Sequence, residues 1–384
     1  MLRLSSRALA LAAALMCGTA MPCFADIKVG ITASATGPGA ALGTPEMKAL
    51  PVLPTEIAGQ KVQYIALDDA SDATKSATNV RKFVTEDKVD ILLGSTLTFT
   101  TLPLIDIAAE SKTPLLAPTA GSVLVDPVDD KRRWVFKVVP NDHIGALALA
   151  KYMAAQGIKT VGYIGFNDAY GEAWTKDVAA TFPGMGMQIV DTEAYARTDT
   201  STTAQVLKLI AAKPDAIFIA ASGTPATVPA HELREKGYKG PMFQTHGVAS
   251  PAFIQAGGKD VDGTVISAEP FVVASQLPDD NPFKKIALDF IERYKAANGS
   301  PPPIFAAHMV DAMSIVAAAA PAALQKGAPG SEAFRAALRD GIEATKQLYL
   351  NNGLLSMSPT DHCGYDQRSA MVMKVENGGF KLLQ

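Results

Sequence analysis

Strand-like and helix-like patterns alternate along nearly the whole chain, and this alternation constrains the fold more than any single motif. Helical periodicity predicts helices over Ala73–Thr85 and Leu102–Glu110. Short apolar runs bounded by turn residues predict four strands around them: Ile27–Ala33, Val62–Leu67, Asp90–Gly94 and Pro114–Ala117. Such alternation is typical of a parallel, doubly wound α/β sheet with helices on both faces.

The same alternation restarts after Val135–Pro140, which predicts a second Rossmann-like lobe of similar size. A chain of 384 residues also suits two lobes better than one. Asn377-Gly378 predicts a closing hairpin. Three helical segments precede that hairpin, and we expect them to return to the first lobe: Pro282–Asn298, Ile304–Leu324 and Ser331–Gly341. In the second lobe we expect strands at Thr160–Gly165, Gln188–Tyr195, Ala216–Ala220 and Met242–Gln244, with helices at Ile144–Gln156, Glu172–Phe182, Ser201–Lys213 and Thr227–Lys236.

Residues 1–25 predict a cleaved secretory signal peptide. Arg3 and Arg7 precede a short apolar run, and small residues precede the expected cleavage between Ala25 and Asp26. No later apolar run reaches the length of a membrane span without charges. We therefore expect a soluble protein that is exported to the periplasm.

Charge and cysteine content narrow the class further. The formal net charge is −3, and loss of Arg3 and Arg7 with the leader makes it −5. Without a basic cluster, such a surface does not favour nucleic acid as a partner. Cys17 and Cys23 leave with the leader, so Cys363 remains alone and no intramolecular disulfide can form. A mature chain of this length can bury enough apolar surface without one.

The segment Ile91–Pro103, ILLGSTLTFTTLP, joins an apolar strand to a turn rich in hydrogen-bond donors. After Gly94 come five hydroxyl residues: Ser95, Thr96, Thr98, Thr100 and Thr101. In open α/β sheets, ligands bind beyond the carboxyl ends of the strands. Alternatively, Thr100 or Thr101 caps the following helix. These residues alone leave both interpretations open.

Five further segments, taken in order, resemble the solute-binding proteins of ABC importers in the Leu/Ile/Val-binding family. They are IKVGITASATGPGAALG, VQYIALDDASDATKSATNVRKFV, VDILLG, TPLLAPTA and VGYIGFNDAYGEAW. The resemblance implies a type I periplasmic binding fold, in which three crossing strands join two α/β lobes and the ligand lies in the cleft between them. It also implies that ligand binding closes the lobes and that the closed form docks on a membrane permease.

The resemblance implies positions for the lobes and for the crossings. The first lobe would comprise residues 26–140 and 270–348, and the second residues 141–269 and 349–384. The crossings would fall near Lys137–Asn141, Ala268–Phe271 and Tyr349–Gly353.

The resemblance also implies a ligand site. In the family's amino-acid binders a strand-end turn holds the ligand carboxylate, and Thr98 matches its hydroxyl position; Thr96 and Leu97 lie in the same turn. Tyr170 matches an aromatic wall. Thr96 could instead cap a helix, and Tyr170 could be ordinary packing. The next strand end matches the second half of the anion site through Thr119, Ala120 and Gly121.

Three positions depart from the amino-acid-binding pattern. His246 stands where an acidic residue normally pairs with the ligand ammonium, Ser222-Gly223 replaces an assisting tyrosine, and Leu42 replaces an aromatic residue. We therefore expect a small carboxylate without an α-amino group, namely an aromatic or branched carboxylic or 2-oxo acid. Phe271 would add an apolar wall. His246 would donate to a ligand oxygen, unless it is a core histidine satisfied by the backbone.

The sequence leaves an alternative ligand and an alternative role open. The alternative ligand is a branched-chain or other hydrophobic amino acid, and the alternative role is that of a soluble periplasmic sensor. We expect no enzyme, because G-x-S-x-G, Walker A and H-E-x-x-H motifs are absent. We expect no cofactor or metal ion, because His231, His308 and His362 lack partners at metal-ligand spacing. The expected partners are a small carboxylate and an ABC permease, and the expected state is a monomer.

Overall fold

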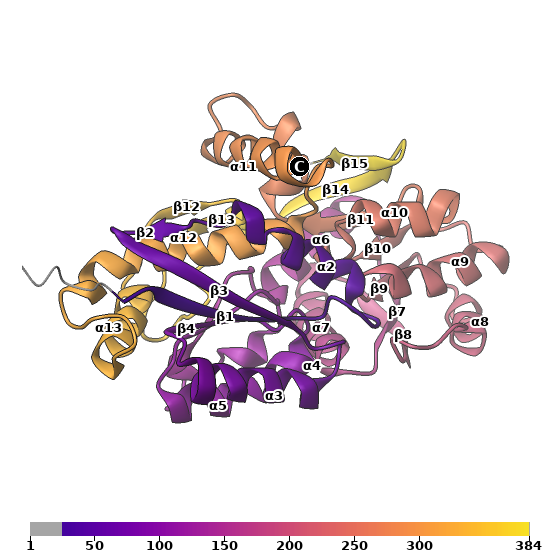
Figure 1. Ribbon diagram of the computed structural model, residues 1–384. Helices are drawn as coiled ribbons and strands as arrows, with labels where there is room; N and C mark the ends of the chain where they lie inside the picture. Colours follow the sequence, from indigo (N-terminus) through magenta and orange to yellow (C-terminus); the bar gives the residue numbers. More distant parts are fainter. Residues whose placement is uncertain (1–24, 384) are drawn as a thin grey trace, which may run out of the picture.

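The computed structural model describes residues 25–383, so the predicted signal peptide lies almost entirely outside the described residues. The chain forms two α/β lobes, each built on one large sheet (Figure 1). This is the predicted fold class.

The first lobe contains a six-stranded sheet in the order β2-β3-β1-β4-β5-β6, and every pairing except β2 with β3 is parallel. Its short central strands are apolar and buried, as expected for a parallel sheet covered on both faces. Figure 1 shows α3 and α5 on one side of this sheet and α12 on the other. The strands are β1 Ile27–Ala33, β2 Glu56–Ile57, β3 Gln60–Asp68, β4 Ile91–Leu93, β5 Leu115–Ala117 and β6 Val135–Lys137; the helices before β6 are α2 Ala40–Lys48, α3 Ala73–Lys82, α4 Thr98–Thr101 and α5 Leu104–Ser111.

The second lobe contains a seven-stranded sheet in the order β15-β14-β11-β10-β9-β7-β8. Strands β7 to β11 are parallel, whereas β14 and β15 form an antiparallel hairpin at one edge. The hairpin turns at Asn377-Gly378, both with positive φ, as predicted. The strands are β7 Thr160–Phe166, β8 Gln188–Tyr195, β9 Ala216–Ala220, β10 Met242–Gln244, β11 Val265–Ala268, β14 Met371–Glu376 and β15 Gly379–Leu382; the helices are α6 Asp142–Ala155, α7 Ala169–Thr181, α8 Thr203–Ala211, α9 Thr227–Glu235 and α10 Pro251–Gly257.

After β11 the chain returns to the first lobe through α11 (Pro282–Asn298), α12 (Ile304–Leu324) and α13 (Glu332–Glu343). The Asn298 side chain at the end of α11 donates to the Lys48 carbonyl at 3.1 Å, and α12 packs against α2 and α13. By length and composition α12 could cross a membrane, but most of it is buried within the protein. It is therefore a core helix of the first lobe.

The first and third passages between the lobes lie side by side. The Lys137 amide donates to the His362 carbonyl at 2.9 Å, and the Tyr365 hydroxyl donates to the Val138 carbonyl at 3.1 Å. Before this passage, β12 (Leu348–Leu350) and β13 (Gly353–Leu355) form a two-stranded antiparallel sheet, and Leu355 also forms an isolated bridge with Tyr365. The segment that follows β13 thus lies beside the first passage, and the expected crossing near Tyr349–Gly353 stays a prediction. Cys363 is buried in this passage as a free thiol.

Candidate functional site

A buried carboxylate organises the turn that follows β4. Asp69, just after β3, is fully buried and accepts hydrogen bonds from the hydroxyls of Ser95 (2.6 Å), Ser34 (2.7 Å) and Thr32 (3.2 Å). These donors come from the carboxyl ends of β1 and β4. Such ends meet at one edge of a parallel sheet, which is where open α/β folds bind ligands.

The threonines of this turn have different roles. The Thr96 hydroxyl donates to Glu46 Oε2 at 2.5 Å and accepts from the Ser34 amide at 2.8 Å. The hydroxyls of Thr100 and Thr101 donate to the Leu97 carbonyl. They do not cap the next helix, because α4 already begins at Thr98. Burial raises the pKa of Glu46 well above its ordinary value, and the Thr96 hydrogen bond only partly offsets this.

Thr98 and Thr119 form a hydroxyl pair on the cavity wall. Their Oγ1 atoms are 3.2 Å apart and both side chains are buried. Each hydroxyl carries one proton, and only one proton is used between them. No other hydrogen bond of either hydroxyl occurs within residues 25–383, so one proton remains to be donated. Gly121 supports the pair rather than lining the cavity, because a Cβ there would lie 2.5 Å from Thr98 Cγ2.

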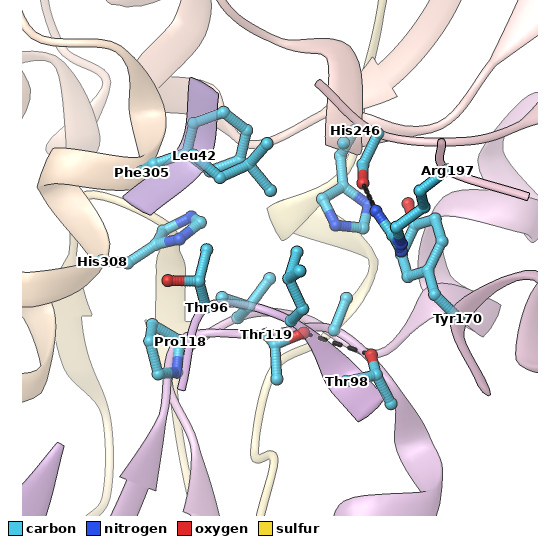
Figure 2. Close-up of a pocket in the computed structure, with 15 residues that line it drawn as sticks. Leu42, Thr96, Thr98, Pro118, Thr119, Tyr170, Arg197, His246, Phe305 and His308 are labelled. Carbon is cyan, nitrogen blue, oxygen red and sulfur yellow. Dashed lines mark hydrogen bonds between the residues drawn. The ribbon is translucent and has the colours of Figure 1, made fainter. Parts of the chain in front are cut away.

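The second lobe contributes Tyr170 at the start of α7. Asp168 caps this helix by accepting from the amides of Tyr170 (2.9 Å) and Gly171 (3.2 Å). The Tyr170 hydroxyl donates to Thr245 Oγ1 at 2.7 Å, and burial raises the pKa of the phenol well above its ordinary value. The ring therefore presents a neutral aromatic face to the cavity (Figure 2).

Arg197 follows the carboxyl end of β8 and places a guanidinium group in the cleft. Its Nε donates to Asp168 Oδ2 at 2.5 Å and its Nη1 donates to Ser222 Oγ at 2.8 Å. The guanidinium carbon lies 4.0 Å from the centre of the Phe166 ring. Arg197 was not predicted as a site residue, although its place after a strand end was the available signal.

Two histidines face the cavity. His246 follows β10, and burial together with Lys137 lowers its pKa to about 3. His308 lies within α12 and is 1% exposed; within residues 25–383 neither of its ring nitrogens has a hydrogen-bond partner. Burial, followed by the influence of His246, lowers its pKa to about 3. Both rings are therefore neutral near pH 7, and each has one donor and one acceptor. His308 was not predicted to face the cavity, because in the sequence it stands out only as a histidine without partners at metal-ligand spacing.

Among residues 25–383, the cavity between the lobes is lined by no aspartate or glutamate, and Arg197 is the only lysine or arginine that lines it. Figure 2 shows Arg197 beside Tyr170 and His246. The space between these walls is about 350 Å³, and this volume includes open solvent at the mouth of the cavity. Nine predicted residues line it: Leu42, Thr96, Leu97, Thr98, Thr119, Ala120, Tyr170, Ser222 and His246. Six others were not predicted: Pro118, Val139, Arg197, Gly247, Phe305 and His308.

Two other predicted residues lie outside the wall. The backbone of Gly223 has a φ of +64°, and a Cβ there would lie 3.0 Å from Leu42 Cδ1. Phe271 was expected as an apolar wall, but its ring packs 5.8 Å from that of Phe290 in α11. Phe305 of α12 contributes an aromatic side chain to the wall instead.

Comparisons with known proteins agree with this geometry. A family model described as periplasmic binding protein matches residues 26–379. The Leu/Ile/Val-binding protein BraC3 of Rhizobium johnstonii is 25% identical over 83% of this chain and 85% of its own length. An extracellular ligand-binding receptor from Rhodopseudomonas palustris HaA2 is 55% identical, with a TM-score of 0.92 over 94% of this chain and all of that chain.

A more distant structure shares the fold. It is the solute-binding protein of an ABC transporter from R. palustris in complex with benzoate, with 20% identity and a TM-score of 0.79 over 94% of this chain and 96% of its own. The two-lobed fold, the cavity between the lobes and the match over residues 26–379 lead to one conclusion: the chain belongs to the periplasmic binding protein family.

Proposed function

We propose that this protein captures a small carboxylate that lacks an α-ammonium group and delivers it to the permease of an ABC importer. The observation that carries the proposal is the charge of the cavity wall. Arg197 and two neutral histidines face the cavity, whereas no aspartate or glutamate in the described part of the chain does. An anion would be paired there, and an ammonium group would not.

Binding of a carboxylate in this cavity is energetically more favourable than binding of an ammonium group. A guanidinium binds a carboxylate through short charge-assisted hydrogen bonds, and a hydroxyl proton of the Thr98–Thr119 pair can add another. A buried ammonium would have only neutral acceptors, and leaving a buried charge unpaired costs about 3–5 kcal/mol. A zwitterionic amino acid therefore suits this cavity less well than an acid of the same shape.

The apolar part of the wall suggests the rest of the ligand. Leu42 and Phe305 lie on one side, and the Tyr170 ring lies on the other (Figure 2). Leu97 also lines the cavity. This surface suits an aromatic or branched carboxylic or 2-oxo acid, and His246 or His308 can donate to an oxo oxygen. The benzoate complex of the R. palustris neighbour supports the aromatic choice.

The two lobes share the binding groups, which supports capture by hinge closure. Thr98 and His308 belong to the first lobe, whereas Tyr170, Arg197 and His246 belong to the second. A ligand can contact both sets only when the lobes are together, so its binding energy favours the closed state.

Thermal unfolding of the mature protein, beginning at Asp26, tests the proposal. Benzoate or 4-methyl-2-oxopentanoate at a hundred times its Kd should stabilise the protein by about 2.7 kcal/mol. Leucine, which has the branched side chain and an ammonium group, should stabilise it much less. Strong stabilisation by leucine, with none by either acid, would instead favour amino-acid transport.

Replacement of Thr98 by valine should weaken benzoate binding by about 10- to 150-fold, or roughly 1.5–3 kcal/mol, because a hydrogen bond to a charged group is lost. Isothermal titration calorimetry measures this change, and the melting temperature should stay nearly constant. Thr96→Val is the matched control. It should mainly lower the melting temperature, since it leaves Glu46 Oε2 and the Ser34 amide without the Thr96 hydroxyl. Unchanged binding by Thr98→Val would remove Thr98 from the site.

A further inference from the structure

Lys137 holds a buried amine directly behind the ligand-facing wall. It is the last residue of β6, and its side chain is completely buried. Its Nζ donates to the carbonyl oxygen of Ala120 and, at 2.5 Å, to Asn141 Oδ1. Ala120 lines the interlobe cavity next to Thr119. One residue of the wall therefore separates the amine from the ligand space.

This amine has no carboxylate close by. Within residues 25–383, no aspartate or glutamate oxygen lies within 4.0 Å of Lys137 Nζ. Burial lowers the pKa of Lys137, while Cys363, Asp142, Asp177 and Asp361 act against this. A buried ammonium without a close counter-ion is costly, which suggests that an anion completes its environment.

We propose that Lys137 determines specificity by favouring an anionic ligand through the Ala120 wall, without touching the ligand. The inference rests on the proposed function and extends it, because Lys137 is absent from the cavity lining. Its charge acts at a range of several ångströms through a region that excludes water, where Coulomb interactions are stronger than in bulk solvent. Lys137 and Arg197 then approach the carboxylate from opposite lobes. The same ammonium repels the α-ammonium of an amino acid.

The alternative is that Lys137 only holds the Ala120 carbonyl in place. Two neutral variants separate the roles, because Lys137→Gln keeps a hydrogen-bond donor and Lys137→Met does not. Lys137→Arg keeps the charge. Benzoate and benzamide serve as probes, since they share a shape but only benzoate is charged at pH 7.5.

Calorimetry should show that Lys137→Gln and Lys137→Met each weaken benzoate binding about 10-fold. Benzamide affinity should change less than twofold, and Lys137→Arg should stay within about threefold of the unmodified protein for benzoate. If the neutral variants lose affinity for benzoate and for benzamide equally, or lose no affinity for benzoate, the role of Lys137 is overturned while the proposed function remains intact. If the unmodified protein binds no carboxylate, the proposed function is overturned, and this inference is overturned with it.

Discussion

Replacement of Arg197 by methionine is expected to weaken benzoate binding by about 30- to several-thousand-fold, equivalent to roughly 2–5 kcal/mol. Methionine keeps much of the buried stem but removes the one cationic side chain that the described residues place on the cavity wall. The ligand carboxylate would then be buried without its charged partner. Isothermal titration calorimetry at pH 7.5 measures the loss.

The control must account for Asp168, because Arg197 also pairs with its carboxylate. The double variant Arg197→Met with Asp168→Asn removes both charges and should remain as weak a binder as the single variant. Arg197→Lys should recover part of the affinity, since lysine keeps the charge but loses the forked donor geometry. Benzoate binding by the double variant at the level of the unmodified protein would show that Arg197 is not the carboxylate partner.

Replacement of His246 by glutamate should nearly abolish benzoate binding at pH 7.5. The change puts an acidic group where the structure has a neutral ring, next to the expected ligand carboxylate. Two like charges at about 4 Å repel by about 4 kcal/mol at an effective dielectric constant of 20, which corresponds to about a thousandfold in affinity. Calorimetry with benzoate and with leucine measures the effect, because the new carboxylate can also pair with an ammonium group.

His246→Gln is the matched neutral control. Glutamine keeps one donor and one acceptor at a similar reach, so benzoate affinity should stay within about tenfold. If His246→Glu binds benzoate as tightly as the unmodified protein, the side chain does not face the ligand. If the His246→Glu variant gains leucine binding and loses benzoate binding, the side chain at position 246 determines which class of ligand binds.

Elements with strong local patterns could be predicted closely from the sequence. The bounds of β8, α11 and α12 match the expected residues, because each has a sustained period or a clear Gly or Pro boundary. The helix α2 was missed. Pro45 lies inside it and glycines flank its first turn, so its local pattern resembles a loop. Packing of α2 against α12 stabilises this helix, whereas its local sequence does not favour one.

Some residues of the candidate site could likewise be predicted from the sequence, and others could not. The end of the strand before Gly94 predicted the turn that contains Thr98, and the resemblance to the family added Thr119, Tyr170 and His246. It assigned an apolar wall to Phe271, which instead packs on α11. His308 was not assigned to the cavity because it lies in the middle of an apolar helix, where a lone histidine resembles a core residue.

The sequence by itself determined the two-lobed α/β fold and the edge of each sheet where polar groups gather, because both follow from local periodicity and strand order. Only the tertiary structure decided which of these groups are available. Thr96 is engaged by Glu46, 50 residues away, while Thr98 bonds only to Thr119 within residues 25–383, so that one hydroxyl proton of this pair remains unused. Likewise, Arg197 and His308 reach one cavity only because the lobes fold together. Hydrogen-bond partners and cavity walls come from distant parts of the chain, so no local sequence pattern predicts them.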